Sequence, residues 1–138
     1  MHQMVVGFAD VDTARQVVRE AAELAAQTGA SMHIVTAIDE DATTVVDIGT
    51  DHWEIRTLDQ AEEAVRNFMV TLSDKVDYTV GVFEGKPADV LIAEAERLDA
   101  DLIVVGNVRM QGPGRLLGSV GSAVAHHAPC SVLIVKTT

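Results

Sequence analysis

The C-terminal part of the chain contains the stretch Leu102-Ile103-Val104-Val105-Gly106-Asn107-Val108-Arg109-Met110-Gln111-Gly112-Pro113-Gly114-Arg115-Leu116-Leu117-Gly118. The apolar run at 102–105 predicts a strand covered on both faces, because strands buried between two helical layers are continuously apolar rather than alternating. The glycine-rich part from Gly106 to Leu117 predicts a loop, followed by a short helix from about Ser119 to His127. After Pro129, a second apolar run predicts a strand at 132–135.

The same alternation of short apolar runs and helical periods extends back to the N-terminus. Apolar runs predict strands at 4–8, 32–37 and 78–83. Apolar residues at three- and four-residue steps predict a helix over 14–25 that ends at Gly29, a helix over 58–72, and a further helix that opens at Pro87. This β-α-β order with right-handed crossovers predicts one α/β domain over residues 1–138, with an open, doubly wound parallel sheet and helices on both faces.

The charge of the chain is unevenly distributed. It has 138 residues and a formal net charge of −11, and all 21 acidic residues precede Leu102. So acidic a protein is not expected to bind nucleic acid or an anionic membrane without sequence preference. The acidic segment at 39–56 lacks a clear period and is long for a connection, so we expect it to be mobile or to cover another part of the molecule. With one cysteine, no leader-like segment and no clean membrane span, we expect a cytoplasmic protein.

The glycine-rich segment is the first candidate site. Ligands of doubly wound sheets bind outside the carboxyl ends of the strands, where the winding reverses. Glycines let backbone N–H groups approach a ligand, and Ser119 adds a hydroxyl at a helix N-terminus. Arg109 and Arg115 add positive charge, and no carboxylate is near in sequence. The pattern fits an anion site or an ordinary loop, and it is not a Walker A motif because no Gly-Lys-Ser/Thr ends it.

Other residues with chemical potential have simpler structural interpretations. Asp10 and Asp12 suit a turn and a helix N-cap better than a metal or phospho-acceptor site. His126 and His127 are adjacent on a predicted helix and point to different faces, so we expect no metal there. Cys130 suits a packed thiol. Because no nucleophile–base pair stands at a usable spacing, we expect no enzymatic activity.

Several segments together resemble the universal stress protein family, and the resemblance covers essentially the whole chain. It implies a five-stranded sheet in the order 3-2-1-4-5, the topology of nucleotide-binding α-hydrolase-like folds. The matching segments are Val5-Val6-Gly7, Thr28-Gly29-Ala30, Gly85-Lys86-Pro87-Ala88, Ala100-Asp101-Leu102-Ile103-Val104-Val105-Gly106, Leu117-Gly118-Ser119-Val120 and His127-Ala128-Pro129-Cys130-Ser131-Val132-Leu133-Ile134-Val135-Lys136.

Members of that family that bind ATP carry a loop of Gly, two residues, Gly, nine residues and Gly-Ser/Thr. They also carry an Asp after the first strand that contacts the nucleoside. The resemblance implies a site by position, with Ala37 at a place that packs on adenine. The implied residues are Ala9, Asp10, Ala37, Val105, Gly106, Arg109, Gly118, Ser119 and Val120.

Three departures from that pattern stand out. Ala9 occupies the expected Asp position, with Asp10 one step later, and Arg109 occupies the position of the middle glycine. Only eleven residues separate Gly106 from Gly118, one fewer than the family spacing. Losing the Asp removes a hydrogen bond to the nucleoside, worth about 1–3 kcal/mol if its partner stays buried.

These departures favour a degenerate nucleotide loop. We therefore expect a non-enzymatic, homodimeric stress-response module without a required cofactor, acting through an unidentified protein partner or through its regulated abundance. The alternative is a regulatory protein that binds ATP, AMP or cyclic AMP with the segment from Gly106 to Val120. Slow ATP hydrolysis is a third hypothesis.

The last strand predicts how the chain associates. An exposed edge made of Val132, Leu133, Ile134 and Val135 is an aggregation hazard unless it is paired. Antiparallel pairing of two copies across a twofold axis resolves this hazard. The family resemblance implies the same arrangement, so we predict a homodimer through this strand.

Overall fold

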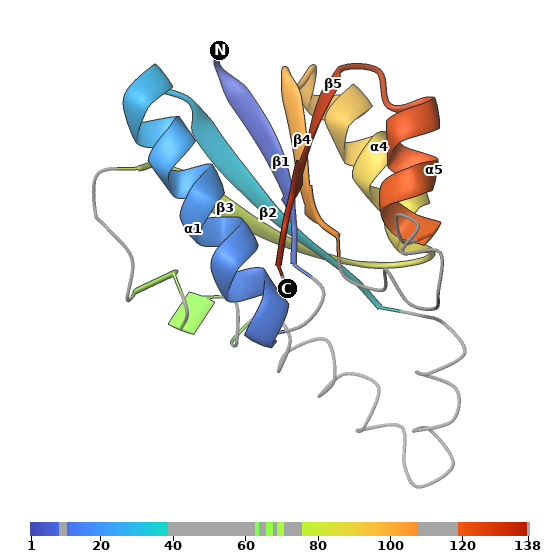
Figure 1. The fold of residues 1–138 in the computed structure, drawn as a ribbon, viewed down its shortest axis with the longest axis horizontal. Helices are drawn as coiled ribbons and strands as arrows, with labels where there is room; N and C mark the ends of the chain where they lie inside the picture. Colours follow the sequence, from blue (N-terminus) through green and yellow to red (C-terminus); the bar gives the residue numbers. More distant parts are fainter. Residues whose placement is uncertain are drawn as a thin grey trace, which may run out of the picture.

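Strands and helices alternate along the chain in a computed structural model, which describes residues 1–8, 11–38, 63, 66–67, 69–70, 76–107 and 119–137. The elements are β1 (Gln3–Gly7), α1 (Val11–Thr28), β2 (Ser31–Ile38), β3 (Tyr78–Glu84), α4 (Pro87–Leu98), β4 (Leu102–Gly106), α5 (Ser119–His127) and β5 (Ser131–Val135). The five strands form one sheet in the order β3-β2-β1-β4-β5 (Figure 1). The predicted α/β fold and strand order are confirmed, and each predicted strand lies within one residue of its observed limits.

β1 lies at the centre of the sheet and sets the place where ligands are expected. It pairs in parallel with β2, where Val5 lies opposite His33, and with β4, where Val5 lies opposite Ile103. The chain winds from β1 to β2 and β3 on one side, and β4 and β5 complete the other side. The winding therefore reverses between β1 and β4, whose carboxyl ends form the edge at which such folds bind ligands.

Two apolar clusters lie on opposite faces of the sheet. α1 covers one face, while α4 and α5 cover the other (Figure 1). Val6 and Val104 lie in the α1-side cluster, whereas Val5 and Ile103 lie in the α4/α5-side cluster, and all four are fully buried. Because successive residues of a strand point to opposite faces, the continuous apolar runs fill both clusters.

Two helices end at residues with left-handed backbone conformation. α1 stops at Gly29, as predicted, with a φ of 77°. α4 stops at Asp99, with a φ of 51°. There the N–H of Asp99 donates to the carbonyl of Glu96 at 3.2 Å, and the N–H of Ala100 donates to Ala95 at 2.9 Å. This pair of bonds is a Schellman motif, in which a non-glycine residue takes the usual glycine position.

The predicted helix over 58–72 is only partly described. Glu63, Arg66, Asn67, Met69 and Val70 are helical, and Met69 is buried in the α1-side cluster. The acidic segment at 39–56 lies outside the described residues. Within the described part of the chain, no helix is both long and apolar enough to cross a membrane.

Candidate functional site

The chain that leaves β1 is fixed to β2. The N–H of Phe8 donates to the carbonyl of Val35 at 2.8 Å, and the Thr36 hydroxyl donates to the carbonyl of Phe8 at 3.0 Å. Phe8 itself is buried in the α1-side cluster. These bonds hold the carboxyl end of the central strand against β2.

Gly106 ends β4 where two other segments approach it closely. A Cβ at this position would lie 3.0 Å from Val17 Cγ2 of α1 and 3.1 Å from Thr137 Cγ2. Both separations are tighter than ordinary side-chain contacts, so a larger residue would have to push α1 or the C-terminal segment away. Packing therefore accounts for this glycine even without a ligand.

Asn107 and Thr137 fix the start of the glycine-rich segment. The Asn107 N–H donates to the carbonyl of Val135 at 3.0 Å. In return, Asn107 Oδ1 accepts the Thr137 N–H at 2.9 Å and the Thr137 hydroxyl at 2.8 Å. We call these contacts the Asn107–Thr137 clasp. The sequence analysis missed it, although an Asn directly after a buried strand is a common position for such side-chain to backbone bonds.

The predicted nucleotide-site residues fall into two groups. Ala9, Asp10, Arg109 and Gly118 lie outside the described residues. Ala37 is half-buried near the end of β2, opposite Phe83. Val105 is buried in the α4/α5-side cluster, and Val120 packs against that same cluster. Ser119 is the first residue of α5, as predicted.

The topology brings several of these positions to one edge. Gly106 and the first turn of α5 lie at the carboxyl-end edge, because α5 runs back from there to the start of β5. Ala37 reaches the same edge on β2, two strands from β4 and thus about 10 Å away at the usual strand spacing. The first N–H groups of α5 lack partners within the helix and give this edge a partial positive charge. A partial positive charge at a helix N-terminus favours an anionic group there.

The strand predicted as a dimer interface lies at the edge of the described sheet. Val132 and Ile134 are half-buried and pack against the α4/α5-side cluster, and Val135 is buried in the α1-side cluster. Leu133 points to the α1 side and is 37% exposed. β5 pairs with β4 along one edge, while no described strand pairs with its other edge.

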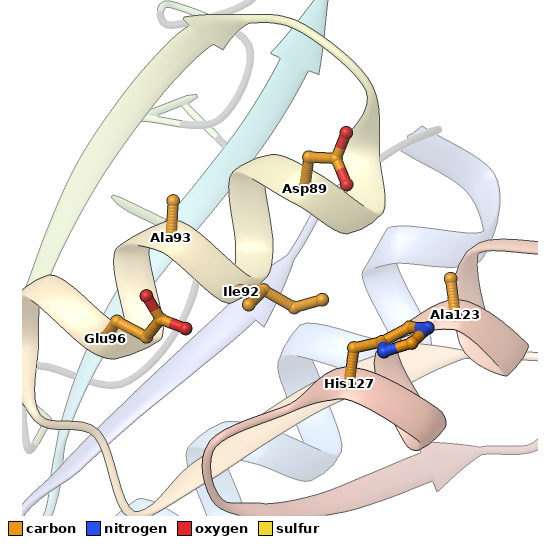
Figure 2. Close-up of a pocket in the computed structure, with 6 residues that line it drawn as sticks. All are labelled: Asp89, Ile92, Ala93, Glu96, Ala123 and His127. Carbon is orange, nitrogen blue, oxygen red and sulfur yellow. The ribbon is translucent and has the colours of Figure 1, made fainter.

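A separate groove lies between α4 and α5 (Figure 2). It encloses about 380 Å³, and the lining residues are Asp89, Ile92, Ala93, Glu96, Ala123 and His127. None of them belongs to the predicted nucleotide site. In the described ranges, no three metal-ligating side chains gather at one place.

Cys130 packs against the α4/α5-side cluster and is half-buried, in agreement with the packed thiol predicted from the sequence. Burial raises the pKa of this thiol, and the nearby charge of Asp101 raises it further. A thiol with a raised pKa is a poor nucleophile at neutral pH, because little of it is ionised.

Comparison with known protein families gives a full-length match. A family model described as the Universal stress protein family matches residues 1–136. Universal stress protein A homolog 2 of Coxiella burnetii is 30% identical over 131 residues, which cover 92% of this chain and 88% of the relative. A universal stress protein of Methanothermobacter thermautotrophicus is 40% identical over 62 residues, which cover 45% of this chain and only 42% of that relative.

Two similar solved structures contain an adenine nucleotide. A universal stress protein in complex with cAMP is 31% identical, with a TM-score of 0.70, and the match covers 99% of this chain and 98% of the other. The universal stress protein of Archaeoglobus fulgidus in complex with dAMP is 25% identical, with a TM-score of 0.66, and the match covers 99% of this chain and 98% of the other.

Proposed function

Because this chain belongs to the universal stress protein family, we propose that it is a regulatory stress-response module that binds an adenine mononucleotide at the carboxyl ends of β1 and β4. The observation that carries the proposal is the full-length likeness to a structure in complex with cAMP, at 31% identity. The reversal of winding between β1 and β4 supports the same location. The role is one of binding, without turnover of the nucleotide.

The sequence of the glycine-rich segment favours a ligand with one phosphate. Arg109 stands where ATP-binding members have a glycine, and the segment is one residue shorter. An arginine side chain is much larger than a glycine, and its guanidinium can form a bidentate pair with a single phosphate. cAMP and dAMP, the nucleotides of the two neighbours, each carry one phosphate.

Calorimetric titration of ligand-free protein with cAMP, AMP and ATP tests this function. We expect a micromolar dissociation constant for a mononucleotide and at least roughly tenfold weaker binding of ATP. Arg109→Ala is expected to weaken mononucleotide binding by about tenfold or more, since a hydrogen bond to a charged group contributes about 1.5–3 kcal/mol. Arg19→Ala makes the same change on the exposed side of α1 and serves as the control. Absence of heat at millimolar nucleotide contradicts the proposal.

A second candidate is a module that has lost its nucleotide and acts through a protein partner. Ala9, in place of the Asp that contacts the nucleoside in ATP-binding members, favours it. The variant Ala9→Asp separates the two candidates. If the natural chain binds nucleotide, the added carboxylate should tighten binding by about tenfold. If only the variant binds, the second candidate holds.

We further propose that two copies associate through β5. The edge of β5 with which no described strand pairs and the exposed Leu133 together offer a strand edge and an apolar contact. Sedimentation at micromolar concentration is expected to give a dimer, and Leu133→Lys is expected to weaken it. Val70→Lys is the matched control, because Val70 is 75% exposed on a helix away from β5. A monomer of the natural chain would contradict this association.

A further inference from the structure

A row of hydrogen-bonded polar side chains, buried at its centre, joins β3, β2 and α4, apart from the candidate nucleotide site. His33 and Thr79 face each other as register partners on neighbouring parallel strands. His33 Nδ1 lies 2.6 Å from the Thr79 hydroxyl, and His33 Nε2 lies 2.9 Å from Glu94 Oε1. Arg97, one turn along α4, donates to both carboxylate oxygens of Glu94, at 2.7 and 3.0 Å. We call the first three residues the Thr79–His33–Glu94 relay. Arg97 binds the carboxylate at its end.

The ionisation of Glu94 fixes the direction of the hydrogen bonds. The hydrogen bonds from Arg97 are the main cause that lowers the pKa of Glu94; burial opposes this effect, and the bond to His33 adds to it. An ionised carboxylate only accepts hydrogen bonds. Nε2 of His33 must therefore carry a hydrogen and donate the hydrogen bond to Glu94. In the neutral imidazole, Nδ1 is then an acceptor, and the Thr79 hydroxyl donates to it. This is the order of hydroxyl, base and orienting carboxylate found in nucleophile–base–acid triads.

The imidazole is buried, whereas Thr79 is an exposed residue whose hydrogen bond to His33 is partly buried. His33 is only 6% exposed, and Glu94 is also 6% exposed, whereas Thr79 is exposed. Gly81 lies two residues after Thr79 on β3. Because Gly81 has no side chain, the Phe83 ring occupies the space next to it. A Cβ on Gly81 would lie 2.6 Å from the Phe83 ring and 3.2 Å from His33 Cε1. The Phe83 ring therefore lies close to the imidazole and helps to keep water from it.

We propose that Thr79 is an acyl-acceptor site, at which the hydroxyl takes an acyl group from a small activated donor such as a reactive ester, thioester or acyl phosphate. In the step, Thr79 Oγ bonds to the carbonyl carbon of the donor, and His33 Nδ1 takes the hydroxyl proton. The bond between that carbon and the leaving group then breaks, and the leaving group departs with the electron pair and accepts the proton from His33. The products are an ester of Thr79 and the protonated leaving group.

Two observations separate this site from an ordinary buried polar cluster. A histidine that only fills the core has no need of a solvent-exposed partner, yet the hydroxyl bonded to His33 belongs to an exposed residue. Glu94 and Arg97 hold the imidazole in the tautomer that accepts a proton from that hydroxyl. Glu94 and Arg97 are thus positioning residues, which act through His33. The site does not depend on nucleotide binding at the other end of the sheet.

Acetylation with 4-nitrophenyl acetate tests the proposal on the full chain. The folded protein is treated with the reagent, digested, and analysed by mass spectrometry for acetyl groups on each threonine. Thr28 is an internal control, because its hydroxyl donates to the carbonyl of Leu24 rather than to a histidine. We expect Thr79 to be acetylated about 100-fold faster than Thr28, the lower end of the range for general-base catalysis. Thr79→Ser is expected to keep the reactivity, and His33→Gln to reduce Thr79 labelling to the rate of Thr28.

Two results overturn the proposal. The first is equal labelling of Thr79 and Thr28 in the folded natural chain, which overturns the proposal whatever the variants show. The second is an unchanged rate of Thr79 labelling in folded His33→Gln. If circular dichroism shows that His33→Gln does not fold, Glu94→Gln takes its place, since it keeps a hydrogen-bonding group beside the imidazole. It is expected to slow Thr79 labelling about tenfold, and an unchanged rate in that variant would count equally against the site.

Discussion

Asp101 binds the backbone of His2 where the neighbouring strands β4 and β1 begin, with Oδ2 accepting the His2 N–H at 2.6 Å. The same oxygen accepts the N–H of Gln3 at 3.0 Å, and the N–H of Asp101 donates to the carbonyl of Gln3 at 2.9 Å. The start of the chain is thereby fixed to the residue that precedes β4. The hydrogen bond from His2, followed by that from Gln3, lowers the pKa of this carboxyl.

Stability is expected to fall in acid partly because of Asp101. Since its folded-state pKa lies below the ordinary value of 3.8, its contribution is present above that value and is lost as the pH falls through the folded-state pKa. Asp101→Asn should therefore be less stable than the natural chain at pH 7 and should converge with it near pH 2. Urea unfolding across this range measures the difference. Asp77→Asn, an exposed change of the same kind beside β3, is the matched control.

Glu94 is expected to show a second, independent dependence on pH. Its pKa is also lowered from the ordinary value of 4.5, so the stability it contributes is present above about that pH and is lost below it. Glu94→Gln should destabilise the chain by about 1–3 kcal/mol at pH 7, because it breaks charged hydrogen bonds to Arg97 and His33. The difference should shrink as the pH falls toward 3. Thermal unfolding of both proteins measures this, and a constant difference across the range would refute it.

The Asn107–Thr137 clasp is expected to contribute to stability and to the order of the candidate site. Asn107→Ala removes both bonds accepted by the side chain, so we expect a loss of about 1–2 kcal/mol in the free energy of unfolding. Lys136→Ala is the control, since Lys136 is the exposed neighbour of Thr137. Urea titration measures both variants. If Asn107→Ala loses no more free energy of unfolding than Lys136→Ala, the clasp does not stabilise the fold.

The two left-handed helix ends give predictions of opposite sign. At Gly29 no atom of the described residues lies within 4 Å of an added Cβ, so Gly29→Ala tests the backbone conformation and should destabilise by about 1 kcal/mol. At Asp99, replacement by glycine relieves the strain of a positive φ and should stabilise by about 0.5 kcal/mol. Chemical denaturation of the two variants side by side provides the measurement. Shifts of the same sign would contradict the assigned conformations.

The limits of the strands could be predicted from the sequence because the signals are local. The runs at 102–105 and 132–135 are apolar over four consecutive residues, and glycine or proline stands near their ends. The stop of α1 at Gly29 was equally visible, because glycine there has a conformational reason. The stop of α4 at Asp99 was not, since an aspartate after a helix gives a much weaker signal of left-handed conformation.

Polar contacts between distant segments could not be predicted in this way. Glu94 shares α4 with Leu91 and Ala95, and its burial follows from a histidine 61 residues earlier in the chain. The Asn107–Thr137 clasp joins residues 30 positions apart that give no periodic signal. At the candidate site, the sequence placed Gly106 directly after a strand and Ser119 at the start of a helix, and the structure has Gly106 as the last residue of β4 and Ser119 as the first of α5. Nothing in the sequence indicated that close packing against Val17 and Thr137 also requires a glycine at position 106.

The central place of β1 has a consequence for how the chain is made. β1 is synthesised first and meets β2 soon afterwards, but its other edge waits for β4, which begins at Leu102. At roughly 5 to 20 residues per second, a ribosome takes several seconds to add the residues between Ile38 and Leu102. During that interval the nascent chain carries an open strand edge and apolar faces. Ribosome-bound chains that stop before β4 should therefore be strong clients of the chaperones that act at the exit tunnel, and chains that extend past β5 should not.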